Sequence, residues 1–312
     1  MLWWFNWVVA RRVGVAQTLT PQARLQKALT EWCGGSLNGE IPTKWEKFAD
    51  VVVLPQTAFR EEEWNCTQEM WEIVAEALKV TRVARMGEVH GEFRQSGIEL
   101  LLGDDDWVVR REHGIDFGYN FTQCMWSSGN VTERGRIANA NHEGEKILDL
   151  YAGIGYYTLP FLSEGTRGPN GERGIGRSAT HVVACEWNPK AIKALKWSLE
   201  KNGVNERCTV LEGDNRKHHF EPEFDRVNLG LLPSSAEGLP IALRALKPEG
   251  GVLHVHGLAP GGNENQWAEK LAQSLEELGP FACHVEHVEN VKWYAPHQRH
   301  IVVDIHALPV SN

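Results

Sequence analysis

A glycine loop that directly follows an apolar run constrains this chain more than any other feature of its sequence. Residues 146–150 (KILDL) predict a buried strand, which leads into residues 149–158 (DLYAGIGYYT). Gly153 and Gly155 let the backbone approach a ligand without a Cβ in the way. A strand followed by such a loop is typical of nucleotide-binding α/β folds, although a tight strand-to-helix turn without a ligand has the same pattern.

Strand and helix signals alternate through the chain after this loop. Strands are predicted at residues 180–185, 208–211, 225–232 and 252–256, helices at 189–202, 240–246 and 265–278, and two late strands at 285–293 and 300–306. This alternation predicts a doubly wound parallel sheet with helices on both faces. Ligands of such folds bind beyond the carboxyl ends of the strands.

The part of the chain before residue 121 has a different texture. Short strand-like runs at residues 51–54 and 98–102 flank a helical pattern at about residues 69–80. We therefore expect a leader over residues 1–30, a small α+β domain over residues 31–120, and a Rossmann-like catalytic domain over residues 121–312.

Composition excludes several classes of protein. The chain has 42% hydrophobic and 23% charged residues, as soluble globular proteins do, and it has no apolar run long enough to span a membrane. The net charge of −9 is unlike that of a general nucleic-acid binder, but arginines and lysines cluster locally. Six scattered cysteines without a CxxC pair favour a reducing, cytoplasmic compartment and predict no metal site.

Two acidic residues follow the next two predicted strands. Glu186 ends one strand and can accept both hydroxyls of a ribose, while Asp214 follows the other and can accept an adenine amino group. Thr158 replaces the third glycine of the dinucleotide fingerprint, which counts against NAD and favours S-adenosylmethionine (SAM). A solvated glutamate at a strand end is the alternative for Glu186.

The turn after the fourth predicted strand bears on the kind of transfer. Enzymes that methylate amines often end this strand in Asn/Asp-Pro-Pro-Tyr/Phe, whereas residues 228–235 read NLGLLPSS. The missing Pro-Pro turn argues against ordinary amine methylation.

Several stretches carry a resemblance to a known family. Together with PTKWEK at residues 42–47, they lie at residues 121–136 (FTQCMWSSGNVTERGR), 148–156 (LDLYAGIGY), 184–189 (ACEWNP), 213–216 (GDNR), 225–227 (DRV) and 229–235 (LGLLPSS). These motifs resemble the wybutosine-synthesis tRNA aminocarboxypropyltransferases, which are similar to the tRNA guanine-37 N1-methyltransferases.

The resemblance implies a function and a set of site residues. It implies transfer of the 3-amino-3-carboxypropyl group of SAM to 4-demethylwyosine at position 37 of tRNA(Phe), with methylthioadenosine as by-product and no metal. With the glycine-loop residues included, the expected SAM-contacting residues are Ser127, Arg134, Asp149, Gly153, Gly155, Glu186, Asp214 and Asn215. No general base or other catalytic residue stands out.

Individual side chains keep alternatives open. Arg134 matches the methionine carboxylate as a guanidinium fork, and a surface salt bridge is its other interpretation. The aromatic residues near the loop could stack on a base or pack in the core; they are Tyr151, Tyr156 and Trp187. His254 and His256 are interpreted as core histidines.

A Gly- and Arg-rich insertion at residues 165–178 departs from the family pattern. It is interpreted either as a neutral surface loop or as a contact with tRNA phosphate. For the whole chain, the competing hypotheses are a tRNA guanine-37 N1-methyltransferase and an inactive SAM-fold scaffold that binds RNA.

Overall fold

The computed structural model describes residues 19–60, 62–91, 95–165 and 176–310 and divides the chain into two compact units. The first unit runs up to Met86 and includes Leu100–Gly103, and the second contains Gly87–Glu99 and Asp104–Asn312. The break between the units therefore falls before the boundary expected at residue 120.

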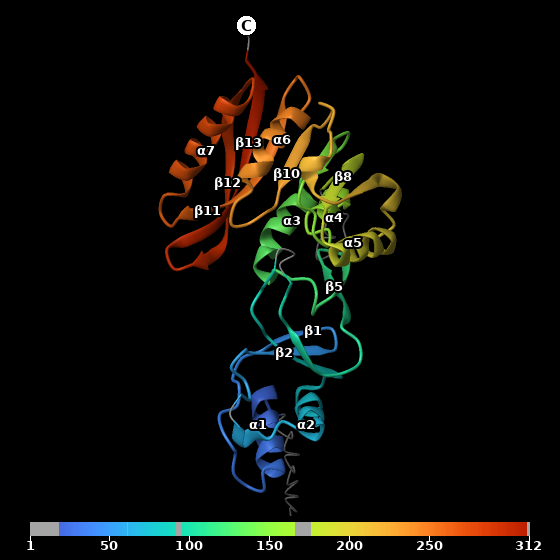
Figure 1. Cartoon of the computed structure of the whole chain (residues 1–312), viewed down its shortest axis with the longest axis vertical. Coiled ribbons are helices and arrows are strands. Elements are labelled where there is room, and N and C mark those ends of the chain that lie inside the picture. Colours follow the sequence, from blue (N-terminus) through green and yellow to red (C-terminus); the bar gives the residue numbers. More distant parts are fainter. Residues whose placement is uncertain (1–18, 61, 92–94, 166–175, 311–312) are drawn as a thin grey trace, which may run out of the picture. The chain divides into compact units, whose positions relative to one another are not determined.

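The first unit is a small α+β fold, as predicted (Figure 1). Its sheet has the order β1 (Glu46–Phe48), β2 (Val51–Leu54), β3 (Arg82–Arg85) and β4 (Glu99–Leu102). Helices α1 (Pro21–Trp32) and α2 (Gln68–Leu78) pack through buried side chains such as Leu25 and Val74. Each begins at a threonine whose hydroxyl accepts a backbone N–H, Thr20 for α1 and Thr67 for α2.

Helix α1 changes the interpretation of the N-terminal segment. It starts at Pro21, inside the expected 1–30 leader, because Thr20 caps it and because Leu25 and Leu29 are fully buried. Residues 1–18 lie outside the described residues.

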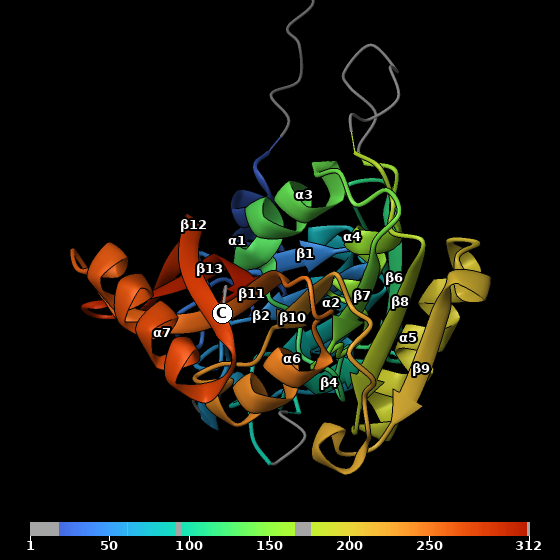
Figure 2. The ribbon, with the colours of Figure 1, turned by 90° about the horizontal axis from the view of Figure 1, so that it is seen from above.

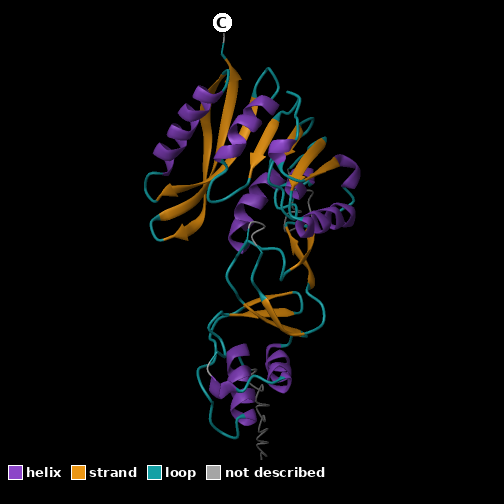
Figure 3. Cartoon of the chain, in the orientation of Figure 1, coloured by secondary structure: helices purple, strands orange, loops and turns teal. Residues whose placement is uncertain are grey.

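The second unit is built on a seven-stranded sheet, drawn as orange arrows in Figure 3. Its order is β12 (Phe281–Ala295), β13 (Gln298–Pro309), β11 (Gly251–Pro260), β10 (Arg226–Leu229), β7 (Lys146–Asp149), β8 (His181–Glu186) and β9 (Cys208–Glu212). The five strands from β11 to β9 are parallel, as predicted. Strand β13 runs antiparallel to both of its neighbours, β11 and β12.

Helices cover both faces of this sheet, which confirms the doubly wound arrangement (Figure 2). Neighbouring strand residues alternate between the faces: Leu148 packs in the core under α6 (Leu239–Ala245) and α7 (Glu264–Leu278). Ile147 packs instead in the core shared with α3 (Val131–Asn139), α4 (Thr158–Leu162) and α5 (Pro189–Lys201).

A hairpin of β5 (Trp107–Glu112) and β6 (Ile115–Asn120) belongs to the second unit. The backbone N–H of Gly118 donates to Ser198 Oγ at 3.0 Å, and that of Asp116 donates to Asn202 Oδ1 at 2.9 Å. Both acceptors lie at the end of α5. Because these bonds tie the hairpin to the sheet domain, the domain starts before residue 121.

Strand β12 is long and irregular. Its pairing with β13 shifts register between Val285 and His287, between Asn290 and Lys292, and between Trp293 and Ala295. An extra residue in one strand re-aims the side chains around it. The shifts place Lys292 and Tyr294 together at the cavity described next.

Most of the predicted insertion, residues 166–175, lies outside the described residues. In the parts that the structure does describe, no helix has the length and apolar composition needed to cross a bilayer.

Candidate functional site

A cavity of about 670 Å³ lies in the second unit, where β7, β8, β9 and β10 end. Because these strands are parallel, their carboxyl ends meet at one edge, where ligands of doubly wound sheets bind. Residues that follow the four strands line it: Leu150, Gly153, Glu186, Trp187, Asp214, Asn215, Gly230 and Leu231.

The glycine loop after β7 has two glycines with different roles. Gly153 lines the cavity with φ +57°, and its N–H donates to Glu186 Oε2 at 2.7 Å. Gly155, with φ +96°, does not line it; a Cβ there would lie 3.0 Å from Leu159 Cδ1 and from Leu195 Cδ1. Gly155 was expected to contact the ligand, but the structure gives it a packing role.

Asp149 also lies outside the cavity lining, contrary to its place among the expected contacts. Its side chain is fully buried at the end of β7, where it accepts from Asn228 Nδ2 at 2.9 Å and Thr158 Oγ1 at 2.7 Å. Burial raises its pKa. Asp149 therefore fastens the loop to β10 and α4 from beneath.

Glu186 is the best-anchored acidic group of the cavity. Its carboxylate accepts three backbone N–H groups, from Gly153 at 2.7 Å, Trp187 at 3.0 Å and Asn188 at 2.8 Å. Burial raises its pKa, while the three donors favour the ionised form. The side chain is thus held rigidly where the ribose-binding acid was predicted.

Asp214 and Asn215 follow β9 and line the same cavity. Arg216 donates to both carboxylate oxygens of Asp214, at 2.9 Å from Nε and 2.8 Å from Nη2, and lowers the pKa of Asp214 to about 2. Asn215 is buried, and its Nδ2 donates to the Leu150 carbonyl at 2.7 Å. These bonds fix the chain that would face an adenine ring.

Arg134 is not where its predicted role requires it. Its side chain is 1% exposed and absent from the cavity lining, because Glu112 of β5 binds it twice, at 2.5 Å and 2.9 Å. Its guanidinium also donates to the Ser127 carbonyl at 3.1 Å and stacks on Trp126. The structure therefore gives Arg134 a salt bridge, but a buried one and not the surface salt bridge of the alternative, and Arg134 supports Ser127 through its carbonyl.

Ser127 does line the cavity, beside a cation that the sequence did not reveal. Lys292 of β12 donates from Nζ to Ser127 Oγ at 2.7 Å and also lines the cavity. The sequence pattern around Lys292, VKWY, is a weak indication of a site, because the register shifts of β12 hide which face the lysine occupies. Asn130 joins them there, and its Nδ2 donates to Tyr157 Oη at 3.3 Å.

The three aromatic candidates all line the cavity. Trp187 is 44% exposed. Tyr156 donates its hydroxyl to the Met125 carbonyl, and Tyr151 packs against the core below α6. Two further aromatic residues that the sequence did not single out also line it, Tyr157 and Tyr294 of β12, the latter 45% exposed.

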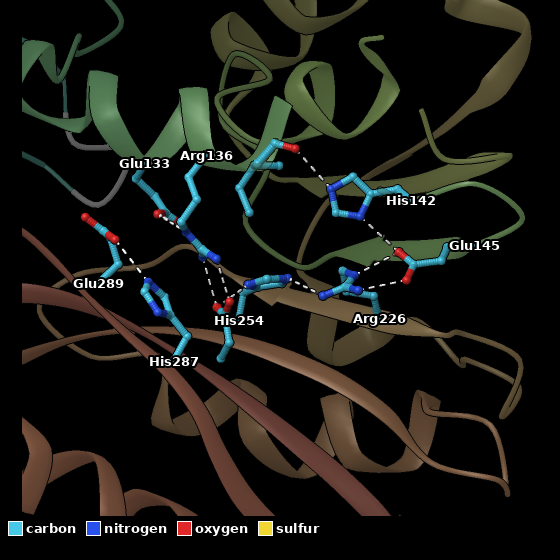
Figure 4. A network of polar contacts seen from close by, with 10 residues as sticks. Glu133, Arg136, His142, Glu145, Arg226, His254, His287 and Glu289 are labelled. Carbon is cyan, nitrogen blue, oxygen red and sulfur yellow. Dashed lines mark hydrogen bonds and ion pairs between the residues drawn. The ribbon is translucent and has the colours of Figure 1, made fainter. Parts of the chain in front are cut away.

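A buried chain of charges holds α3 on the sheet (Figure 4). Arg136 donates to Glu133 and to Asp304, with 2.6 Å between Nη1 and Asp304 Oδ2. Asp304 also binds His254 Nδ1 at 2.5 Å, and His254 Nε2 lies 2.8 Å from Arg226 Nη1. His254 and His256 are both 2% exposed, which confirms them as core histidines. Within the described ranges, no His, Cys, Asp or Glu cluster is suited to a metal ion.

Comparison with known proteins identifies the family. Residues 108–286 match the TRM5/TYW2 methyltransferase domain, and residues 25–106 match the TYW2 N-terminal domain. The chain is 35% identical to the tRNA wybutosine-synthesizing protein 2 homolog of Bos taurus. The alignment is 357 positions long and covers 94% of this chain and 79% of that protein. The chain belongs to the TRM5/TYW2 family.

Other relatives of the family extend this comparison. The chain is 43% identical over 287 residues to the Arabidopsis thaliana tRNA wybutosine-synthesizing protein 2/3/4, covering 90% of this chain but only 27% of that protein. Among solved structures, Pyrococcus horikoshii TYW2 in complex with MeSAdo aligns with a TM-score of 0.72 and 27% identity, over 91% of this chain and 99% of that one.

Proposed function

We propose that this chain transfers the 3-amino-3-carboxypropyl group of SAM to 4-demethylwyosine at position 37 of tRNA(Phe), releasing methylthioadenosine. The observation that carries the proposal is the similarity of both its domains to proteins named for wybutosine synthesis, combined with the acid-lined cavity beyond the parallel strands. The P. horikoshii TYW2 structure contains MeSAdo, which is what remains of SAM after this transfer.

The residues at the ends of β8 and β9 suit the adenosine half of SAM. Glu186, which three backbone donors fix in place, keeps about one of its four lone-pair sites, on Oε2, for a ribose hydroxyl. Asp214 and Asn215 line the part of the cavity that would receive the adenine ring, and the partly exposed Trp187 lines the cavity as well.

SAM carries three carbons on its positively charged sulfur, and each is electrophilic. In the proposed transfer, an acceptor ring carbon forms a bond to Cγ of the methionine arm while the Cγ–S bond breaks. The bonding pair stays on sulfur, which becomes a neutral thioether, and the acceptor carbon loses a proton. Which carbon reacts depends on which one the cavity turns toward the acceptor.

Methylation of tRNA guanine 37 is the second candidate, because the matched family model covers both TRM5 and TYW2. The turn after β10 disfavours it. Gly230, Leu231, Leu232 and Ser234 line the cavity there, in place of a polar residue followed by two prolines. This turn is therefore mostly apolar, with Ser234 as its polar lining residue, and it lacks the motif that amine-methylating enzymes present.

The by-product distinguishes these reactions. The chain is incubated with SAM and tRNA(Phe) bearing 4-demethylwyosine, and both small molecules and nucleosides are analysed by mass spectrometry. We expect methylthioadenosine and a nucleoside heavier by one aminocarboxypropyl group, and no product with an unmodified transcript. S-adenosylhomocysteine would instead establish the methyltransferase, and SAM binding without turnover on either tRNA would favour the inactive scaffold. Selectivity for tRNA(Phe) and a cytoplasmic location are predictions of the same proposal.

A further inference from the structure

The cavity has a second polar region, supplied by segments other than those that follow β8 and β9. Lys292 comes from β12, and Ser127 and Asn130 flank a short 3-10 turn that precedes α3. In the sheet, β12 and β9 are opposite edges. A ligand whose adenosine half lies near Glu186 and Asp214 would thus extend toward Lys292.

The lysine is built into the wall of the cavity. Its Nζ donates to Ser127 Oγ at 2.7 Å, and its stem lies against Gly129, where a Cβ would come within 2.4 Å of Lys292 Cδ. Ser127 is in turn held by Arg134, which donates to its carbonyl. Glycine at 129 therefore leaves room for the lysine, and Arg134 positions the hydroxyl that orients its ammonium group.

This ammonium group lacks a countercharge. Among the residues described, no carboxylate lies within ion-pair distance of Lys292 Nζ, whereas the neighbouring Arg134 is neutralised by Glu112 at 2.5 Å. Burial and the Arg134 guanidinium lower the pKa of Lys292. A partly buried cation without a counterion is unfavourable, so an anionic group in the cavity would stabilise it.

We propose that Lys292 and Ser127 form the subsite for the carboxylate of the methionine arm of SAM. The assignment rests on the proposed function, and it gives Lys292 the role that the sequence suggested for Arg134. A carboxylate fits better than a tRNA phosphate, because Nζ lies in the wall of the cavity that receives the remainder of SAM. Holding the carboxylate at this end turns the methionine arm toward β12 and α3, so that Cγ is available to the acceptor.

Decarboxylated SAM tests the assignment, because it differs from SAM only in lacking the carboxylate. Calorimetry gives the Kd of both ligands for the full chain and for three variants, K292M, K292R and K270M. Lys270 is an exposed residue of α7 and controls for the loss of one positive charge. We expect K292M to weaken SAM binding by about 10- to 100-fold, the loss of one charge-assisted hydrogen bond, and to leave decarboxylated SAM unaffected.

The two conservative variants sharpen the outcome. K292R keeps the charge and should keep most of the preference for SAM over decarboxylated SAM, and K270M should keep all of it. An unchanged preference in K292M would overturn the assignment alone, and a raised KM for tRNA in that variant would place Lys292 on an RNA phosphate instead. If the unsubstituted chain bound no SAM, the proposed function would fail together with this subsite.

Discussion

Glu186 is the residue that the proposed function makes responsible for recognition of the adenosine half of SAM. Replacing it with glutamine removes the charge and turns one of the acceptor oxygens into a donor, facing backbone N–H groups that need an acceptor. We expect E186Q to weaken SAM and methylthioadenosine equally, by about 10- to 100-fold, because both ligands carry the same ribose. Calorimetric titration with both ligands measures this, and loss of affinity for SAM alone would show that Glu186 contacts the methionine arm.

Gly155 does not line the cavity and lies against two leucine side chains, so its substitution should affect stability first. G155A introduces a residue at φ +96° and a Cβ 3.0 Å from two leucine side chains, and we expect a loss of about 2–3 kcal/mol in the free energy of unfolding. Gly203 provides a matched control, since its φ is +68° but no atom lies within 4 Å of an added Cβ. G203A should cost only about 1 kcal/mol. Equal losses in urea unfolding would mean that backbone strain alone explains both.

At the level of elements, the buried charges decide how α3 is held against β11 and β13. Asp304 accepts from both Arg136 and His254, so D304N leaves a buried guanidinium with only Glu133 as carboxylate partner. We expect a loss of about 3 kcal/mol in the free energy of unfolding. The exposed pair of Lys196 and Glu212 is the contrast, because E212Q should change stability by less than about 1 kcal/mol. Comparable effects in urea titrations would contradict the importance of burial.

The sequence predicted most elements of the second unit because each parallel strand is an apolar run followed by a turn signal. It predicted less well where tertiary contacts decide. The β5–β6 hairpin joins the second unit through Ser198 and Asn202, which are distant in sequence. Strand β13 runs antiparallel to β11 and β12, and this direction likewise depends on pairing that periodicity does not encode.

Some residues of the candidate site could likewise be predicted from the sequence, and others depend on tertiary contacts. Residues at strand ends, such as Glu186 and Asp214, were predictable, because the topology of a doubly wound sheet brings strand ends together. Arg134 lies outside the cavity lining because its counterion, Glu112, comes from a hairpin whose position no sequence pattern indicated. Lys292 was missed because bulges in β12 decide which of its side chains reach the cavity.

Across the whole second unit, three histidines are buried in the antiparallel half of the sheet, His254 and His256 on β11 and His300 on β13. Arg226 can only donate, so Nε2 of His254 accepts and its Nδ1–H donates to Asp304, which requires a neutral ring. His256 Nδ1 and His300 Nε2 lie 3.1 Å apart, so one must accept from the other. The native fold therefore needs His254 and at least one imidazole of the pair His256 and His300 unprotonated.

The contribution of these histidines to the stability of the fold should consequently fall in mild acid. Burial lowers the pKa of His254 and of His300 to about 4 and that of His256 well below 6.5, so the unfolded chain binds more protons as pH drops from 6.5 toward 4. The lowered pKa of His254 and that of His300 each reduce the free energy of unfolding by about 2 kcal/mol at pH 5. Burial also raises the pKa of Glu133, to about 7, and those of Asp149 and Glu186, and these carboxyl groups act in the opposite direction. The contribution of a histidine is therefore read from a comparison of the chain with H300L. In urea unfolding at pH 7.5, 6.0 and 5.0, the stability of H300L relative to the chain should rise by about 2 kcal/mol toward pH 5, whereas the same pH dependence in both would mean that His300 is protonated in the native state.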